Sequence, residues 1–142
     1  MSALFFKRFL SRPMQVASIV PSSKALIKRV ASKFDFTQPR VIVEFGPGEG
    51  CHTRELLSRM HPESTLLLFE LDSELAVHLE EQFADDARVV VINADAQRIR
   101  EELARLGFDC CDYVLSGIPF STMEIGKKRA LLQATFDSLA ST

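Results

Sequence analysis

Short apolar runs alternate with segments of helical periodicity along most of this 142-residue chain. Four runs have the length and composition of buried strands, at residues 40–45, 65–70, 88–93 and 112–115. After each run, apolar residues recur every three or four positions, which predicts helices at about residues 50–60, 73–83, 97–106 and 124–139. The pattern therefore predicts four strands, each followed by a helix.

Regular alternation of strands and helices is typical of an α/β fold with a parallel sheet and right-handed crossovers. We therefore expect a Rossmann-like, doubly wound sheet at residues 39–142, preceded by amphipathic and basic helices at residues 1–38. Within that N-terminal part, the apolar positions of residues 4–10 and of residues 25–34 each predict a helix. In such sheets, ligands bind at the carboxyl ends of the strands.

Each predicted strand ends in a polar or glycine-rich feature. These features are Glu44 with Gly46, Gly48 and Gly50, then Glu70 and Asp72, then Asn93 and Asp95, and finally Ser116 and Gly117. One such feature alone is often structural, because turns and helix N-caps need the same residue types, and Asp72 fits an N-cap. Four strand ends that face one crevice point together to a ligand site.

The glycine loop and the acid after the second strand restrict the class of ligand. The loop lacks the Gly-Lys-Ser/Thr ending of a phosphate-binding loop, and its third glycine, Gly50, comes too early for G-x-G-x-x-G. Glu49 within the turn would repel a pyrophosphate. Glu70 lies about 20 residues beyond the loop, where nucleotide-binding folds place a carboxylate that accepts from ribose hydroxyls. A cationic ligand with a ribose and an adenine, such as S-adenosylmethionine, fits better.

Composition and charge add two constraints. Hydrophobic residues make up 46% of the chain, which is enough for a core, and the net charge of −2 gives no global sign of nucleic-acid binding. The charge is divided unevenly, because residues 1–40 carry +7 and residues 41–142 carry −9. A basic leading segment on an acidic body indicates contact with an anionic surface, or packing of one part on the other.

Cysteine and histidine usage indicates a reduced setting without a metal. The three cysteines, Cys51, Cys110 and Cys111, are odd in number and lack a C-x-x-C spacing, and no histidine has metal-ligand spacing to them. No apolar run is long enough to span a bilayer, and the first residues do not follow a signal-peptide pattern. We therefore expect a cytoplasmic protein.

Several runs resemble motifs of the class I S-adenosylmethionine-dependent methyltransferases. Residues 44–50 (Glu-Phe-Gly-Pro-Gly-Glu-Gly) are similar to motif I, residues 69–72 to the ribose-binding acidic motif, and residues 93–96 to the adenine-binding motif, with Asn93 where glycine is commoner. More narrowly, nearly the whole chain resembles bacterial phospholipid N-methyltransferases, which methylate phosphatidylethanolamine. That likeness includes the Phe-rich basic start and residues 115–120.

The resemblance implies a role for each motif residue. Gly46, Gly48 and Gly50 would line the methionine part of S-adenosylmethionine with Glu44 near its amino group, Glu70 would bind the ribose hydroxyls beside Leu71, Asp95 would accept from the adenine amine, and the Ala96 N–H would meet a ring nitrogen. Ser116, Gly117, Ile118, Pro119 and Phe120 would border the point of methyl transfer. The related ribosomal RNA adenine dimethyltransferases carry Asn-Leu-Pro-Tyr/Phe there, so Ser116-Gly117 argues against base methylation.

The N-terminal helix has two interpretations. Phe5, Phe6 and Phe9 either enter a lipid interface, while Lys7 and Arg8 meet anionic lipid, or pack on the domain itself or on a second subunit. The family resemblance favours the interface, and therefore a peripheral membrane association with a phospholipid substrate and no nucleic acid.

Class I methyltransferases usually have seven strands, so the four predicted here resemble a form truncated after strand four. That strand would then be an exposed edge, so either the chain is a truncated form of a longer enzyme or another chain, such as a second copy, covers the edge. Three hypotheses follow: a phospholipid N-methyltransferase, a methyltransferase acting on RNA adenine or another small substrate, and a non-catalytic module that binds cofactor or oligomerises.

Overall fold

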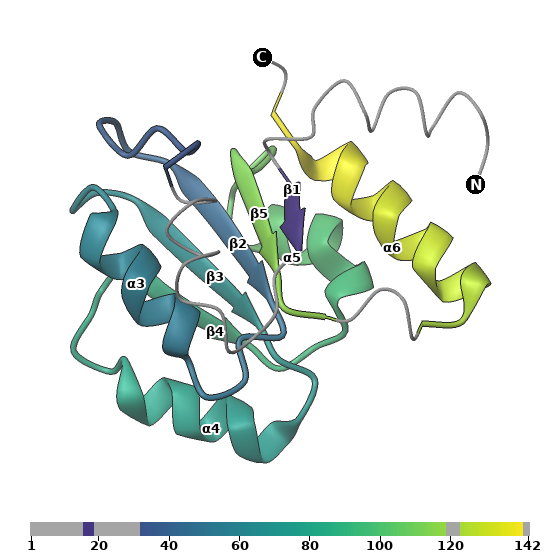
Figure 1. Cartoon of the computed structure of the whole chain (residues 1–142), viewed down its shortest axis with the longest axis horizontal. Helices are drawn as coiled ribbons and strands as arrows, with labels where there is room; N and C mark the ends of the chain where they lie inside the picture. The colour runs from purple at the N-terminus through teal and green to yellow at the C-terminus, as the bar shows by residue number, and fades with distance from the viewer. Residues whose placement is uncertain (1–15, 19–31, 119–122, 141–142) are drawn as a thin grey trace.

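The computed structural model describes residues 16–18, 32–118 and 123–140, which form one parallel sheet covered by helices (Figure 1). The strands are β1 (Val16–Ser18), β2 (Val41–Phe45), β3 (Thr65–Phe69), β4 (Val89–Ile92) and β5 (Tyr113–Ser116). Their order across the sheet is β1-β5-β2-β3-β4, and every pairing is parallel. The carboxyl ends of β2, β3, β4 and β5 therefore lie along one edge of the sheet.

The helices follow the strands as the periodicity predicts. They are α3 (Cys51–Arg59), α4 (Ser73–Gln82), the short 3₁₀ turn η1 (Ala96–Arg98), α5 (Ile99–Arg105) and α6 (Ile125–Ser138). Asp72 is the predicted N-cap of α4, since its carboxylate accepts hydrogen bonds from the backbone N–H groups of Glu74 and Leu75 at 2.9 and 3.0 Å. Each predicted helix after a strand is confirmed, and the one expected at 97–106 begins as a 3₁₀ turn.

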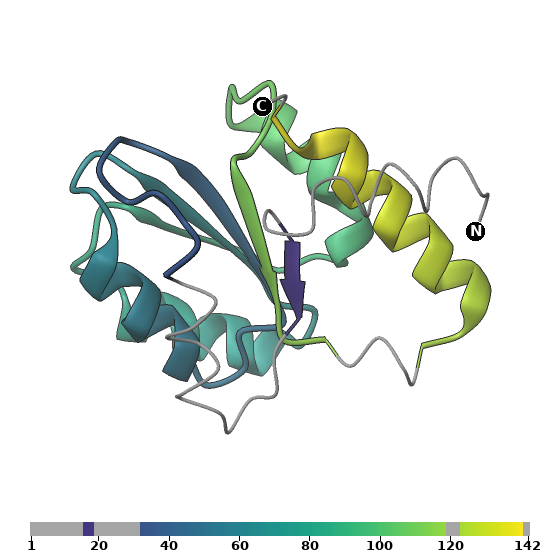
Figure 2. The ribbon, with the colours of Figure 1, turned by 45° about the horizontal axis from the view of Figure 1, so that its top comes forward.

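Alternate strand residues divide the core into two layers. Ile42 and Leu66 face the layer that contains Leu56 of α3 and Leu79 of α4. Their strand neighbours face the layer of α5 and α6, which contains Val43, Phe45, Leu67, Ile99 and Leu131. Figure 2 shows the two helical layers on opposite faces of the sheet. This doubly wound arrangement confirms the expected Rossmann-like α/β class.

The strand β1 corrects the expectation of an exposed edge at the fourth predicted strand. Val16, Ala17 and Ser18 pair with Val114, Leu115 and Ser116, so β5 has a neighbour on each side. The expectation that a second copy of the chain covers an exposed edge at β5 is therefore wrong. The strand lies within the predicted N-terminal segment 1–38, whereas the predicted helix at residues 4–10 lies outside the described residues.

Candidate functional site

A cavity of about 310 Å³ opens where the carboxyl ends of β2 to β5 meet. Its wall consists of Gly46, Phe69, Glu70, Leu71, Ala94, Asp95, Ala96, Gln97, Ile118, Met123, Lys127 and Leu131. One or more residues after each of these four strands reach this wall. The convergence predicted from the sequence is therefore present, with α6 adding a further side.

The glycine loop is held tightly against its neighbours. Gly46 has a backbone φ of 61°, a value that residues with a side chain rarely adopt. Its N–H donates a 2.9 Å hydrogen bond to the carbonyl of Phe69. A Cβ atom at this position would lie 3.1 Å from Cγ1 of Ile118. Glycine therefore lets the backbone of the loop, rather than a side chain, form this part of the cavity wall.

Glu70 connects the loop to the end of β3. Its side chain is buried, with 8% exposure, and its two oxygens accept 3.1 Å hydrogen bonds from the N–H groups of Gly48 and Asp72. A carboxylate has about four acceptor positions, so it can accept further hydrogen bonds from a ligand while these two remain. The carboxylate is thus fixed in place at the edge of the cavity before any ligand binds.

Asn93 and Asp95 shape the adjoining wall. The Asn93 amide donates to the carbonyls of Glu70 and Leu71 at 2.9 and 3.1 Å, and so ties the end of β4 to the end of β3. Asp95 caps η1, because its carboxylate accepts a 2.8 Å hydrogen bond from the N–H of Gln97, while the side chain stays exposed. The backbone around Leu71 and Asp95 is therefore fixed by side-chain hydrogen bonds.

Glu44 lies beneath the loop rather than on the cavity wall. It is 1% exposed, and Oε1 accepts a 2.6 Å hydrogen bond from the hydroxyl of Thr53 on α3. Burial raises the pKa of Glu44 to about 7, against the smaller, lowering effect of the Thr53 hydrogen bond. The pair joins β2 to the helix that follows the glycine loop.

The segment after β5 differs from the expectation in one respect. Ser116 is fully buried, and its Oγ accepts a 3.2 Å hydrogen bond from the N–H of Ile118, so the hydroxyl stabilises its own turn. Gly117 allows a close approach, because a Cβ atom there would lie 2.9 Å from the carbonyl oxygen of Gly46. Ile118 is the residue of this segment on the cavity wall, and Pro119 and Phe120 lie outside the described residues.

The predicted residues that the structure describes thus separate into two groups. Gly46, Glu70, Leu71, Asp95, Ala96 and Ile118 lie on the wall, and Glu44, Gly48, Gly50, Ser116 and Gly117 support it from behind or beside. The sequence motifs did not indicate the wall residues of the last helix and its approach, Met123, Lys127 and Leu131. Their spacing of four residues is the pattern that places side chains on one helical face, and it could have indicated them.

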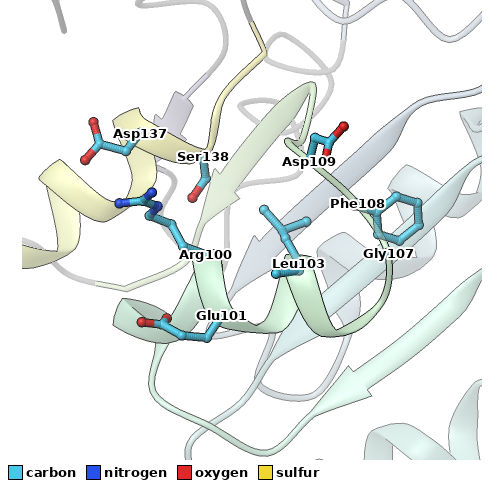
Figure 3. A pocket seen from close by; sticks show the side chains of 9 residues that line it. Arg100, Glu101, Leu103, Gly107, Phe108, Asp109, Asp137 and Ser138 are labelled. Atoms are coloured by element: carbon cyan, nitrogen blue, oxygen red, sulfur yellow. The ribbon is translucent and has the colours of Figure 1, made fainter.

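A second hollow, of about 530 Å³, lies between α5 and α6 (Figure 3). Arg100, Glu101, Asp109 and Asp137 give its wall charges of both signs. It contains none of the motif residues. No group of three or more potential metal-ligating His, Cys, Asp or Glu side chains occurs within residues 16–18, 32–118 and 123–140. Over the same residues, no helix combines the length and the apolar character that crossing a bilayer requires.

Comparison with known proteins identifies the class to which this fold and site belong. The family model for ribosomal RNA adenine dimethylase matches residues 21–101. The ornithine lipid N-methyltransferase of Singulisphaera acidiphila is 30% identical over 137 residues, which are 96% of this chain and 71% of that protein. Ribosomal RNA small subunit methyltransferase H of Bordetella petrii is 36% identical over 88 residues, which are 62% of this chain but only 24% of that protein.

Among solved structures, the 23S rRNA methyltransferase ErmE has a TM-score of 0.59 at 24% identity, over 84% of this chain and 43% of that one. This likeness confirms the fold. The glycine loop and the buried, hydrogen-bonded carboxylate of Glu70 fit an adenosyl ligand with a ribose. The protein is an S-adenosylmethionine-dependent methyltransferase. More narrowly, the chain belongs to the ribosomal RNA adenine dimethylase family.

Proposed function

We propose that this protein N-methylates the primary amine of a lipid headgroup, with phosphatidylethanolamine as the expected substrate. The observation that carries the proposal is the extent of similarity to the ornithine lipid N-methyltransferase, which includes 96% of the chain. The match to the rRNA dimethylase family ends at residue 101, before Ile118, which lies on the cavity wall. The lipid relative is therefore the better guide to the substrate side of the site.

Bound S-adenosylmethionine supplies the methyl group. We assign Glu70 to the ribose hydroxyls, beside Leu71, and Asp95 with the Ala96 N–H to the adenine, because these groups lie on one wall and their backbone is fixed by hydrogen bonds. Gly46, Gly48 and Gly50 would contact the methionine part. Glu44 is buried and bonded to Thr53, so we assign it to positioning the loop rather than to direct contact.

The substrate side of the cavity supports an aliphatic amine over a nucleobase. Ile118 and Met123 give it an apolar surface, and the Ser116 hydroxyl is engaged in its own turn. Residues 116–118 and Met123 include no carboxamide to hold the amine of a base, in contrast to the asparagine of the rRNA enzymes. The carboxamide of Gln97, also on the wall, donates a hydrogen bond to the Lys127 carbonyl. Apolar side chains here would exclude water and orient the amine, which is the contribution that a direct displacement at carbon requires.

The direct test is methyl transfer from S-adenosylmethionine labelled in its methyl group. The purified chain is incubated in mixed micelles with phosphatidylethanolamine, with ornithine lipid, or with phosphatidylcholine as the control that has no free amine. We expect label in the lipid fraction for an amine lipid only. Label in neither amine lipid would contradict the proposal.

Methylation of rRNA adenine is the second candidate. The family match and the relatives that act on rRNA favour it. It predicts label in a ribosomal RNA substrate and none in the lipids under the same conditions. A third result, in which calorimetry detects S-adenosylhomocysteine binding but no substrate is labelled, would support the non-catalytic module.

A further inference from the structure

The first turn of α6 concentrates positive charge beside the mouth of the cavity. Lys127, Lys128 and Arg129 are consecutive, and Lys127 lies on the cavity wall. Arg40, Arg59, Arg88 and Arg105 each pair with a carboxylate, whereas these three cations form no ion pair with any residue that the structure describes. We call Ile125, Lys127, Lys128 and Arg129 the cationic end of α6.

The acids nearest to this end are engaged by backbone groups. The Glu124 carboxylate accepts hydrogen bonds from the N–H groups of Gly126 and Lys127 at 2.8 and 3.0 Å. The Asp95 carboxylate, also on the cavity wall, accepts from the N–H of Gln97. They reduce the local positive charge without pairing with the three cations. Within residues 41–142, which carry −9 in total, attraction for an anionic surface is confined to a few such places.

Two large apolar side chains are exposed at the same edge of the sheet. Ile125 is 68% exposed in the first turn of α6, and Leu71, on the cavity wall, is 69% exposed. Exposed apolar residues next to unpaired cations are the combination that binds a lipid interface, because the cations meet phosphates while the apolar groups enter the acyl boundary. RNA phosphates would use the cations but would leave both apolar side chains in water.

We propose that the cationic end of α6 docks on the phosphate-bearing surface of an anionic bilayer, so that the cavity opens toward the lipid headgroups. This inference rests on the proposed lipid methyltransferase function and adds a contact surface to it. Docking there would bring a headgroup amine to the cavity without drawing the lipid out of the bilayer. Each cation near such a surface contributes about 1 kcal/mol, so two cations change partitioning by well over tenfold.

The test uses charge reversal away from the cofactor wall. The test variant is Lys128→Glu/Arg129→Glu. The control is Lys33→Glu/Arg59→Glu, which changes the net charge by the same amount. The control lies at the opposite edge of the sheet, where Arg59 ends α3. Binding of the full chain is measured by co-sedimentation with phosphatidylglycerol-containing vesicles and with pure phosphatidylcholine vesicles. We expect the α6 variant to bind the anionic vesicles at least about tenfold more weakly, and the control to bind as wild type does. A third variant, Ile125→Ser, should weaken binding to both kinds of vesicle.

Activity separates this inference from the proposed function. On a short-chain phosphatidylethanolamine below its micelle concentration, the α6 variant should methylate as wild type does, while its activity on vesicles falls. If wild type methylates neither form of phosphatidylethanolamine and does not methylate ornithine lipid, the proposed function fails. If wild type methylates both and the α6 variant binds vesicles normally, only the docking surface is overturned. Binding of wild type to an RNA oligonucleotide, lost in the α6 variant and without vesicle binding, would also overturn it.

Discussion

The carboxyl group of Glu44 sits at the base of the glycine loop, where solvent does not reach it. Burial raises its pKa from the ordinary 4.5 to about 7. Between these two values the unfolded chain releases the proton while the folded protein retains it. Ionisation of Glu44 therefore lowers the free energy of unfolding. This loss is absent below pH 4.5, grows as the pH rises, and reaches its full size above pH 7.

The variant Glu44→Gln removes this penalty, because an amide does not ionise. We expect the free energy of unfolding of the variant, relative to wild type, to increase from pH 5 to pH 8 by up to about 3 kcal/mol. Urea denaturation at pH 5, 6, 7 and 8 measures the difference, with Glu55→Gln, at a half-exposed position of α3, as the control. A difference that does not change with pH would show that Glu44 ionises normally in the folded protein.

Asn93 acts on the site through the backbone of its neighbours. Its amide holds the carbonyls of Glu70 and Leu71, so Asn93→Ala should loosen the wall that we assign to ribose and adenine. The side chain is exposed, and water can replace the lost donors, so the cost to stability should stay near 1 kcal/mol. We expect S-adenosylhomocysteine binding, measured by calorimetry, to weaken about tenfold, since preorganisation of the site is lost.

Ser58→Ala is the matched control for Asn93→Ala. It removes a 2.7 Å hydrogen bond from an exposed side chain to the Glu55 carbonyl, on a helix turn away from the cavity. Ser58→Ala should change stability little, since the higher helix propensity of alanine offsets the lost bond, and only the Asn93 variant should lose affinity. Equal affinity in the two variants would place Asn93 outside the binding machinery.

The residue types at the strand ends predicted much of the site. They did not predict the direction in which each side chain points. Glu70 follows a buried run and was expected near the ligand, and the structure places it on the cavity wall. Ser116 follows the predicted strand 112–115, but it is the last residue of β5, level with Phe69 rather than Glu70, and its hydroxyl accepts from the N–H of Ile118. The difference depends on the backbone path after each strand, which one sequence does not reveal.

At the level of elements, the local apolar pattern predicted those strands whose burial produces a continuous apolar run. The bounds of β2, β3, β4 and β5 lie within about one residue of the expected runs, because continuous apolar stretches are buried on both faces of a parallel sheet. By contrast, β1 has three residues, Val16 to Ser18, and its partner lies almost 100 residues along the chain. A strand this short has no periodicity of its own, so only the tertiary pairing defines it.

The pairing of β1 makes a prediction for the neighbouring strand. Removal of residues 1–18 would leave one side of β5 without a partner strand. We expect amide hydrogen exchange in β5, at Val114 to Ser116, to accelerate about tenfold or more for the N–H groups that face β1. The N–H groups of β3, which keeps its two partner strands, are the internal control. Unchanged protection across β5 would mean that β1 contributes no lasting hydrogen bonds.

For the molecule as a whole, topology places the site. Right-handed crossovers bring the carboxyl ends of β2 to β5 to one edge, so residues separated by more than 70 positions, such as Gly46 and Ile118, meet across one cavity. The sequence predicted this edge because it depends only on the order of strands and helices. It did not predict the wall from α6, since the position of that helix follows from the packing of Leu131 and Phe136 in the core.

Cofactor binding should therefore stabilise the whole fold and depend on Glu70. At S-adenosylhomocysteine concentrations 100-fold above its Kd, we expect wild type to gain about 2.7 kcal/mol in free energy of unfolding. Glu70→Ala would be hard to interpret, because it also removes the acceptors of the Gly48 and Asp72 N–H groups. Glu70→Gln keeps one acceptor oxygen and removes the charge.

If the Glu70 carboxylate binds the ribose, affinity should fall at least about thirtyfold in Glu70→Gln. At the same ligand concentration, the gain in the free energy of unfolding would then shrink to about 1 kcal/mol or less. Thermal denaturation with and without S-adenosylhomocysteine measures the gain, so any loss of stability in the free variant cancels. Glu74→Gln, in the exposed first turn of α4, should keep the full gain. Among the described residues of the cavity wall, Glu70 is the one buried carboxylate that hydrogen bonds hold in place before a ligand binds. Equal gains in the two variants would therefore mean that the cofactor binds at some other part of the molecule.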